Sequence, residues 1–97
     1  MQIARVVGSA VSTIKDDALT GRKLLVVRPA DPSDQLVGDP YVAVDAIGAG
    51  EGELVLVVTG SAARRTASTA DAPVDAAIIA ILDSLEVGGE ATFRKGY

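Results

Sequence analysis

Five short apolar stretches, separated by polar or glycine- and proline-rich connections, set the pattern of this 97-residue chain. They are rich in valine and other β-branched residues, which suit a pleated, half-buried surface, and they predict strands over residues 3–13, 23–28, 41–47, 53–59 and 91–94. Gly8 interrupts the first stretch at a point where a small barrel needs a bend or bulge. We expect the first two strands to pair, and residues 29–40 to form an exposed loop because Pro, Asp, Ser and Gly dominate there.

The third and fourth stretches are joined by a loop that contains Gly48, Gly50 and Gly52. Two valine-rich runs on either side of so short a connection predict a hairpin with an unusual loop, since glycine adopts backbone angles closed to other residues. Residues 60–72 lose their large apolar side chains, which predicts a loop or a mobile flap.

Residues 73–85 have the features of a helix. Pro73 is harmless in a first turn, the charge of Asp75 suits the positive helix end, and apolar residues then recur at helical spacing. This stripe consists of Val74, Ala77, Ile78, Ile81, Leu82 and Leu85. A strand through residues 78–87 remains the alternative because isoleucine is frequent there. Gly88 and Gly89 predict a turn before the last strand.

Short strands without strand–helix–strand alternation predict a mainly β fold. We expect a small closed antiparallel barrel of oligonucleotide-binding-like type, with one short helix at about 73–85, as a single domain over residues 1–97. Closure into a barrel would also remove exposed sheet edges.

The composition predicts a second buried surface in addition to the barrel core. Hydrophobic residues make up 48% of the chain although only 3% are aromatic, so the apolar side chains are numerous and small. A domain of this size cannot hide all of them internally, which predicts a homo-oligomer packed closely through Ala, Gly and Val.

Charge and residue types exclude several classes of function. The net charge is −4 and no stripe of Lys or Arg is present, which disfavours nucleic acid as a partner. Cysteine and histidine are both absent, which removes disulfides, thiolate zinc sites and the commonest proton shuttle. Ser61 lacks the GxSxG context of a nucleophile, so we expect neither an enzyme nor a cofactor. No leader peptide or apolar run of membrane-spanning length is evident, and we expect a soluble, cytosolic protein.

Three features of the central region allow more than one interpretation. The glycine loop joins two strands and carries Glu51 and Glu53, which argues against phosphate binding and for close approach of a second backbone. Asp45 lies in an apolar strand, so it either faces solvent or is buried with partners, for which we expect the amides of residues 48–50 or a cation such as Arg64. Arg64 is either a solvated surface charge or a bidentate contact across a subunit boundary.

Six blocks of the sequence resemble the bacterial microcompartment vertex proteins, the pentameric shell family that includes ethanolamine-utilisation and carboxysome vertex subunits. The blocks are GSAVSTIK at 8–15, GRKLLV at 21–26, VAVDAIGAG at 42–50, GELVL at 52–56, GSAAR at 60–64 and PVDAAIIAILD at 73–83. The resemblance implies a structural protein whose homopentamers cap the five-fold vertices of a microcompartment shell in the cytoplasm. It also implies hexameric facet proteins as partners, and a single-stranded nucleic-acid-binding barrel is the alternative function.

The resemblance also implies roles for particular residues. A subunit interface or central opening would involve Asp45, Gly48, Gly50, Gly52, Gly60, Ser61 and Arg64. Ala62 stands where relatives often have a second serine, which removes a hydroxyl from that loop. By charge alone, Lys15, Arg22 and Lys23 are candidate contacts for a facet hexamer.

Overall fold

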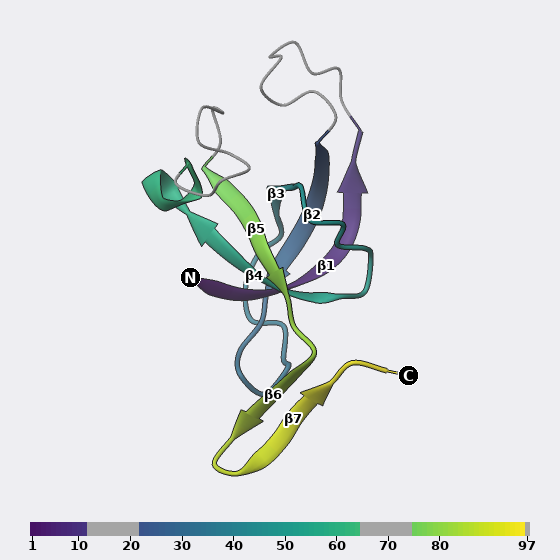
Figure 1. Ribbon diagram of the computed structural model, residues 1–97, viewed down its shortest axis with the longest axis vertical. Coiled ribbons are helices and arrows are strands. Elements are labelled where there is room, and N and C mark those ends of the chain that lie inside the picture. Colours follow the sequence, from purple (N-terminus) through teal and green to yellow (C-terminus); the bar gives the residue numbers. More distant parts are fainter. Residues whose placement is uncertain (12–21, 65–74, 97) are drawn as a thin grey trace.

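The computed structural model describes residues 1–11, 22–64 and 75–96, and five of its strands close into a barrel (Figure 1). The elements are β1 (Gln2–Ala10), β2 (Lys23–Pro29), β3 (Tyr41–Asp45), β4 (Leu54–Thr59), the 3-10 helix η2 (Gly60–Arg64), β5 (Ala76–Ile81), β6 (Ser84–Val87) and β7 (Glu90–Arg94). The barrel order is β1-β2-β3-β5-β4, and β6 and β7 form a separate hairpin. The predicted small closed β-barrel is therefore confirmed.

Strand pairing differs from the prediction in two respects. The strands β3 and β4 do not form a hairpin, because β5 lies between them and pairs with both. The β3–β5 pair is parallel, with Val44 opposite Ala77 and Asp45 opposite Ile78, so the expectation of an entirely antiparallel barrel was wrong at this seam. Nearness along the chain suggested the hairpin, but closing the barrel required a strand from the distant 76–81 segment in that position.

Two local predictions for the first strands are confirmed. The strands β1 and β2 pair in antiparallel fashion, and their register shifts between Val6 and Gly8, which is the bulge expected at the glycine. The segment after β2 makes a tight turn in which the side chain of Asp31 accepts hydrogen bonds from the backbone amides of Ser33 and Gln35, at 2.9 and 3.0 Å.

The predicted helix at 73–85 was wrong in the part that the structure describes. Residues 76–81 form β5 and residues 84–87 form β6, so the alternative of a strand was right in type but wrong in predicting one continuous strand over 78–87. The proposed helix start before Asp75 lies outside the described residues. Ala76 and Ile78 face the barrel interior, while Ala77 is buried on the outer side beneath η2. A strand buried on both faces shows no polar alternation, so its apolar run matched helical spacing by chance.

Small side chains fill the interior of the barrel. The main core cluster contains Ala4, Val6, Leu25, Val27, Ala43, Ala49, Val55, Val57, Ala76 and Ile78, with Tyr41 and Ile81 packed against it. Alanine and valine suit this narrow space, and each fully buried valine or leucine contributes about 1.5–3 kcal/mol to folding. A second cluster outside the barrel joins Val44, Ala63 and Ala77, and it shows that η2 covers the outer surface of β3 and β5.

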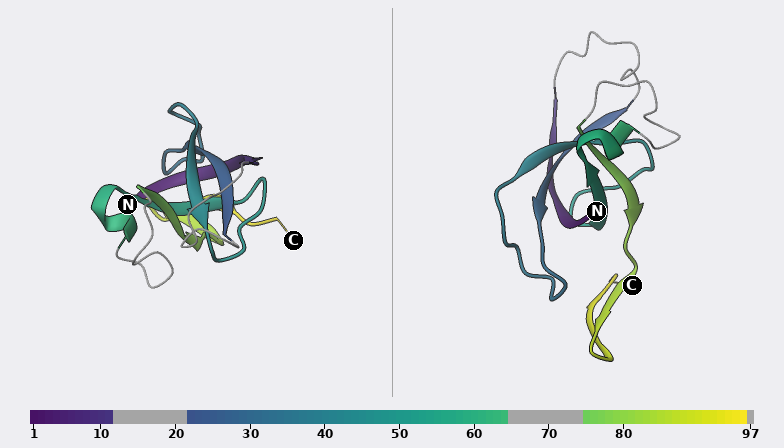
Figure 2. Two further views of the ribbon diagram at one scale, coloured as in Figure 1. Left: turned by 90° about the horizontal axis from the view of Figure 1, so that it is seen from above. Right: turned by 90° about the vertical axis from the view of Figure 1, so that its left-hand side faces the viewer.

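The hairpin β6–β7 projects from the end of the barrel opposite η2, as two directions of view agree (Figures 1 and 2). Its turn is formed by Gly88 and Gly89, both with positive φ, as the sequence predicted. The molecule is consequently elongated, with principal extents of 45 × 25 × 24 Å.

Candidate assembly surface

The glycine loop, residues 46–53, crosses one end of the barrel from β3 to β1. Its far end extends the β1–β4 pairing, because the Gly52 amide donates to the Val6 carbonyl at 2.8 Å and the Val6 amide donates to the Glu53 carbonyl at 2.9 Å. Between these anchors Ala49 enters the main core and is fully buried. The loop therefore acts as a plug for the barrel as well as a connection between strands.

The backbone of the glycine loop requires glycine at two positions. Gly48 has a φ of 94° and Gly52 a φ of 90°, values that residues with a Cβ atom rarely adopt. Gly50 is different, because a Cβ atom there would lie 3.4 Å from Glu53 Oε1, which is ordinary contact. The pattern of residues alone does not distinguish Gly50 from the other two glycines.

Asp45 is buried below the glycine loop with 1% of its surface exposed. Its Oδ1 accepts a hydrogen bond from the Ile47 amide at 3.1 Å, and its Oδ2 lies 3.6 Å from Nζ of Lys23. Lys23 in turn donates to the Ala49 carbonyl at 2.8 Å. The predicted type of partner was correct, but the amide is that of residue 47 and the cation is Lys23.

Glu53 closes the loop from its other end. Oε1 of Glu53 accepts a hydrogen bond from the Gly50 amide at 2.7 Å, and Oε2 lies 3.0 Å from Nζ of Lys95. Two hydrogen bonds hold the pKa of the Glu53 carboxyl below its usual value: the larger effect comes from Lys95 and the next from the Gly50 amide. The charged form of Glu53 is thus the one that fits this site.

A strip of valines lies on the outer surface of β1, β2 and β3. Val26 lies opposite Val42 on β3 and opposite Gly8 on β1, so these positions share the outer surface, next to the bulge residue Val7. Val42 is 46% exposed and Val7 38% exposed. We call Val7, Val26 and Val42 the outer valine strip, which the sequence analysis did not single out although period-two alternation along the strands could have shown it.

Two further predicted site residues lie away from the glycine loop. Gly60 and Ser61 begin η2, and both are exposed. In the views of Figures 1 and 2, η2 and the glycine loop lie on opposite sides of the barrel. Arg64 ends η2, Arg22 immediately precedes β2, and Lys15 lies outside the described residues.

The described residues offer little for catalysis or cofactor binding. In residues 1–11, 22–64 and 75–96, no three His, Cys, Asp or Glu side chains come together as metal ligands. Within the same ranges no helix has the length and apolar character that crossing a bilayer requires. Fold and surface together define a small closed-barrel protein with an apolar strip on its outer surface.

Comparison with known proteins identifies the family. Residues 1–83 match the family described as ethanolamine utilisation protein EutN/carboxysome. The chain is 47% identical over 95 residues to the carboxysome shell vertex protein CcmL of Thermosynechococcus vestitus. This alignment covers 98% of this chain and 96% of the relative. This protein therefore belongs to the EutN/CcmL family.

Solved structures agree with this assignment over most of the chain. The structure of CcmL from Nostoc sp. is 44% identical, has a TM-score of 0.88, and covers 98% of this chain and 100% of that one. GrpN from Rhodospirillum rubrum, described as a pentameric microcompartment shell protein, is 41% identical with a TM-score of 0.80 and covers 90% of this chain and 99% of that one.

Proposed function

We propose that this chain is a structural shell protein that forms homopentamers and occupies the five-fold vertices of a bacterial microcompartment in the cytoplasm. The observation that carries this proposal is the similarity over almost the full length, in both sequence and fold, to proteins named as shell vertex proteins or as a pentameric shell protein. A flat layer of hexagonal tiles closes only if five-fold units are introduced, so the pentamer would supply curvature. The function would then depend on shape and would need no catalytic group.

Cyclic symmetry demands that two different surfaces of the barrel meet, one from each neighbouring copy. The outer valine strip supplies an apolar surface that the single chain leaves partly exposed. The glycine loop presents backbone with few side chains, which suits close approach between subunits. We place Asp45, Gly48, Gly50 and Gly52 in this interface on these grounds, with Asp45 acting from below the loop.

Two further groups of residues keep the roles that the resemblance implies. Gly60, Ser61 and Arg64 would line a central opening or a second part of the interface, since Gly60 and Ser61 are exposed on η2. Hexameric facet proteins would be the partners at the rim of the pentamer, with Lys15 and Arg22 as candidate contacts. Lys23 is less suited to that role, because its ammonium group is held by Asp45 and by the Ala49 carbonyl.

The nucleic-acid-binding alternative gains no support from the described surface. Such barrels use exposed aromatic rings as stacking platforms. In the part of the chain that the structure describes, the ring of Phe93 faces the guanidinium of Arg5 and the hydroxyl of Tyr41 donates to Gln2. The relatives named above favour the shell function.

The mass of the purified protein in solution tests the proposal. Five copies of the 9.9 kDa chain would weigh about 50 kDa by light scattering, and micromolar samples should show this species. A strictly monomeric protein at that concentration would overturn the proposal. Co-expression with a facet hexamer and imaging of closed shells, with and without this chain, would test the vertex position itself.

A further inference from the structure

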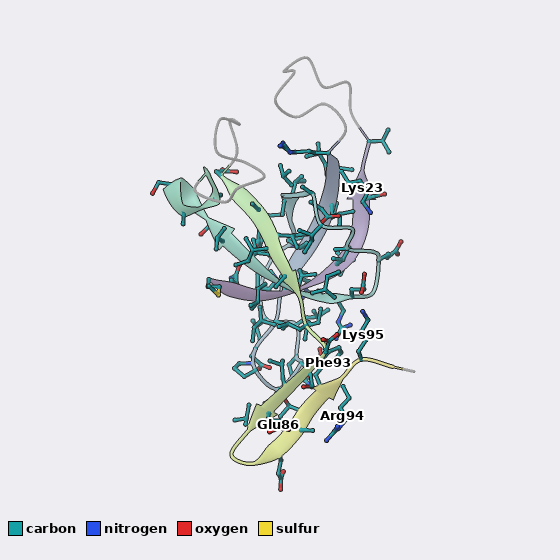
Figure 3. The ribbon with its side chains drawn as sticks, viewed as in Figure 1. Lys23, Glu86, Phe93, Arg94 and Lys95 are labelled. Atoms are coloured by element: carbon teal, nitrogen blue, oxygen red, sulfur yellow. The ribbon has the colours of Figure 1, made fainter. Side chains whose placement is uncertain are left out.

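The C-terminal hairpin β6–β7 contacts the turn after β2 through a polar group, because Oγ1 of Thr92 donates to the Pro32 carbonyl at 2.5 Å. The base of the hairpin is closed by the Lys95 amide, which donates to the Asp83 carbonyl at 2.8 Å. Side chains alternate along a strand, so Phe93 and Lys95 face one side and Arg94 the other. Figure 3 shows Phe93 and Lys95 between the hairpin and the barrel, and Arg94 farther out.

Arg5 on β1 joins three segments at this junction. Its guanidinium donates to the Gly52 carbonyl at 2.6 Å, forms an ion pair with Asp34, and lies 5.7 Å from the centre of the Phe93 ring. The glycine loop, the turn after β2 and the hairpin therefore meet at one side chain. A cation over the face of an aromatic ring is attracted by the negative charge of that face, so this contact is favourable.

Glu53 makes a second connection between the glycine loop and the hairpin. One carboxylate oxygen holds the Gly50 amide, and the other holds the ammonium group of Lys95 beyond the end of β7. A pocket of about 200 Å³ lies between these contacts, and Arg5, Glu53, Phe93 and Lys95 are among the residues that line it. The hairpin thus contacts the loop at Gly52 through Arg5 and at Gly50 through Glu53.

We propose that the C-terminal hairpin positions the glycine loop for contact with a neighbouring copy of the chain, and that Lys95 does so by fixing the orientation of Glu53. This inference rests on the proposed pentamer. A loop with two positive-φ glycines has many conformations available, so an orienting contact at Gly50 selects the one that a neighbour can bind. The hairpin then matters for assembly even though its turn lies far from the loop.

The pH dependence of assembly provides a readout specific to this contact. Lys95 from the hairpin end and Lys23 from β2 act on Glu53, and Arg5 with its partner Asp34 lies nearby on the same side of the barrel. The pKa of Glu53 is lowered in the folded chain because the charged carboxylate is stabilised by its partners. This stabilisation is fully present above the ordinary carboxyl pKa and is lost as the pH falls through the lowered value. Acid should therefore weaken the assembly of the wild type more than that of a variant without Lys95.

The experiment compares Lys95→Met with Arg94→Met, the same replacement one position away on the outer side of the hairpin. The concentration at which the pentamer is half dissociated is measured from pH 7 down to about pH 3, so that the scan reaches below the ordinary carboxyl pKa. For Lys95→Met we expect this half-dissociation concentration to rise roughly three- to tenfold at pH 7 and to change less with pH than that of the wild type. Arg94→Met should match the wild type, and Lys95→Arg should restore most of the assembly.

The variant Glu53→Gln guards against a folding defect in Lys95→Met, because it removes the ion pair from the other side and should weaken assembly similarly. If Lys95→Met and Glu53→Gln both assemble as Arg94→Met does, from a pentameric wild type, the hairpin has no positioning role and the inference fails while the proposed function stands. If the wild type is itself monomeric, the proposed function fails and takes this inference with it.

Discussion

Asp45 is the single charged side chain buried in the described part of the chain, and it links its own strand β3 to the glycine loop and to Lys23 on β2. Its Oδ1 fixes the start of the glycine loop through the Ile47 amide, while its Oδ2 makes no hydrogen bond within the described residues and has only the attraction of Lys23 at 3.6 Å. A buried carboxylate is costly unless a cation compensates it. Lys23 is therefore better explained as part of the barrel end than as a facet contact.

Replacement of Asp45 by Asn should destabilise the barrel. The amide side chain keeps an acceptor for the Ile47 amide but loses the attraction to Lys23, whose side chain is 57% exposed and so partly screened by water. We expect a loss of about 1–2 kcal/mol in the free energy of unfolding, measured by denaturant titration. Asp39→Asn, at an exposed position in the 31–40 segment, is the control and should be neutral. An Asp45→Asn protein as stable as the wild type would contradict this account.

At the scale of elements, the glycine loop has one role in core packing and a proposed second role in assembly. Ala49 is buried in the barrel core, while Gly50 donates its amide to the Glu53 side chain, accepts a hydrogen bond from the Glu53 amide at 3.2 Å, and has room for a Cβ atom. Folding and assembly therefore depend on different residues of one loop. This separation allows a substitution that disturbs one function and spares the other.

Gly50→Val should prevent assembly more than it harms folding. In the single chain a Cβ atom at this position meets Glu53 at ordinary contact distance, but at a close subunit contact the valine side chain would hold the neighbouring backbone away. We expect light scattering to give a species near 9.9 kDa that still unfolds cooperatively, whereas Gly50→Ala, the smaller control, should keep some pentamer. A valine variant that stays pentameric with an unchanged melting temperature would refute the interface assignment.

At the scale of the whole molecule, a barrel with small interior side chains leaves apolar surface on its outside. The outer valine strip lies on β1, β2 and β3, and the strands β4 and β5 form the other side of the closed barrel. A ring of five copies would bury such a surface repeatedly, once at each boundary. Stability and assembly should then be linked, so that the melting temperature rises with protein concentration.

Val42→Lys tests the outer valine strip. The side chain is 46% exposed in the single chain, so a lysine there can reach water and the barrel should fold, but burying its charge between copies would be unfavourable. We expect loss of the pentamer, with at least a tenfold rise in the concentration needed for half assembly. Val37→Lys, on an exposed valine of the 31–40 segment, makes the same chemical change away from the strip and should remain pentameric. Equal assembly of the two variants would exclude the strip from the interface.

The sequence by itself determined five of the seven described strands, the bulge at Gly8, the turn at Gly88 and Gly89, and the family. These follow from β-branched runs, from glycine conformations and from motif blocks, which are local properties of the chain. It also indicated that Asp45 would need a partner, because burial in an apolar strand demands one.

Only the tertiary structure decided how distant segments meet. It inserted β5 between β3 and β4, which turned an apparent helix into a strand covered on both faces, because barrel closure outweighs local spacing. It also brought Lys23 to Asp45, and Lys95 to Glu53, across 22 and 42 positions of sequence respectively. Such pairs depend on the path of the whole chain, and no spacing within a single segment encodes them.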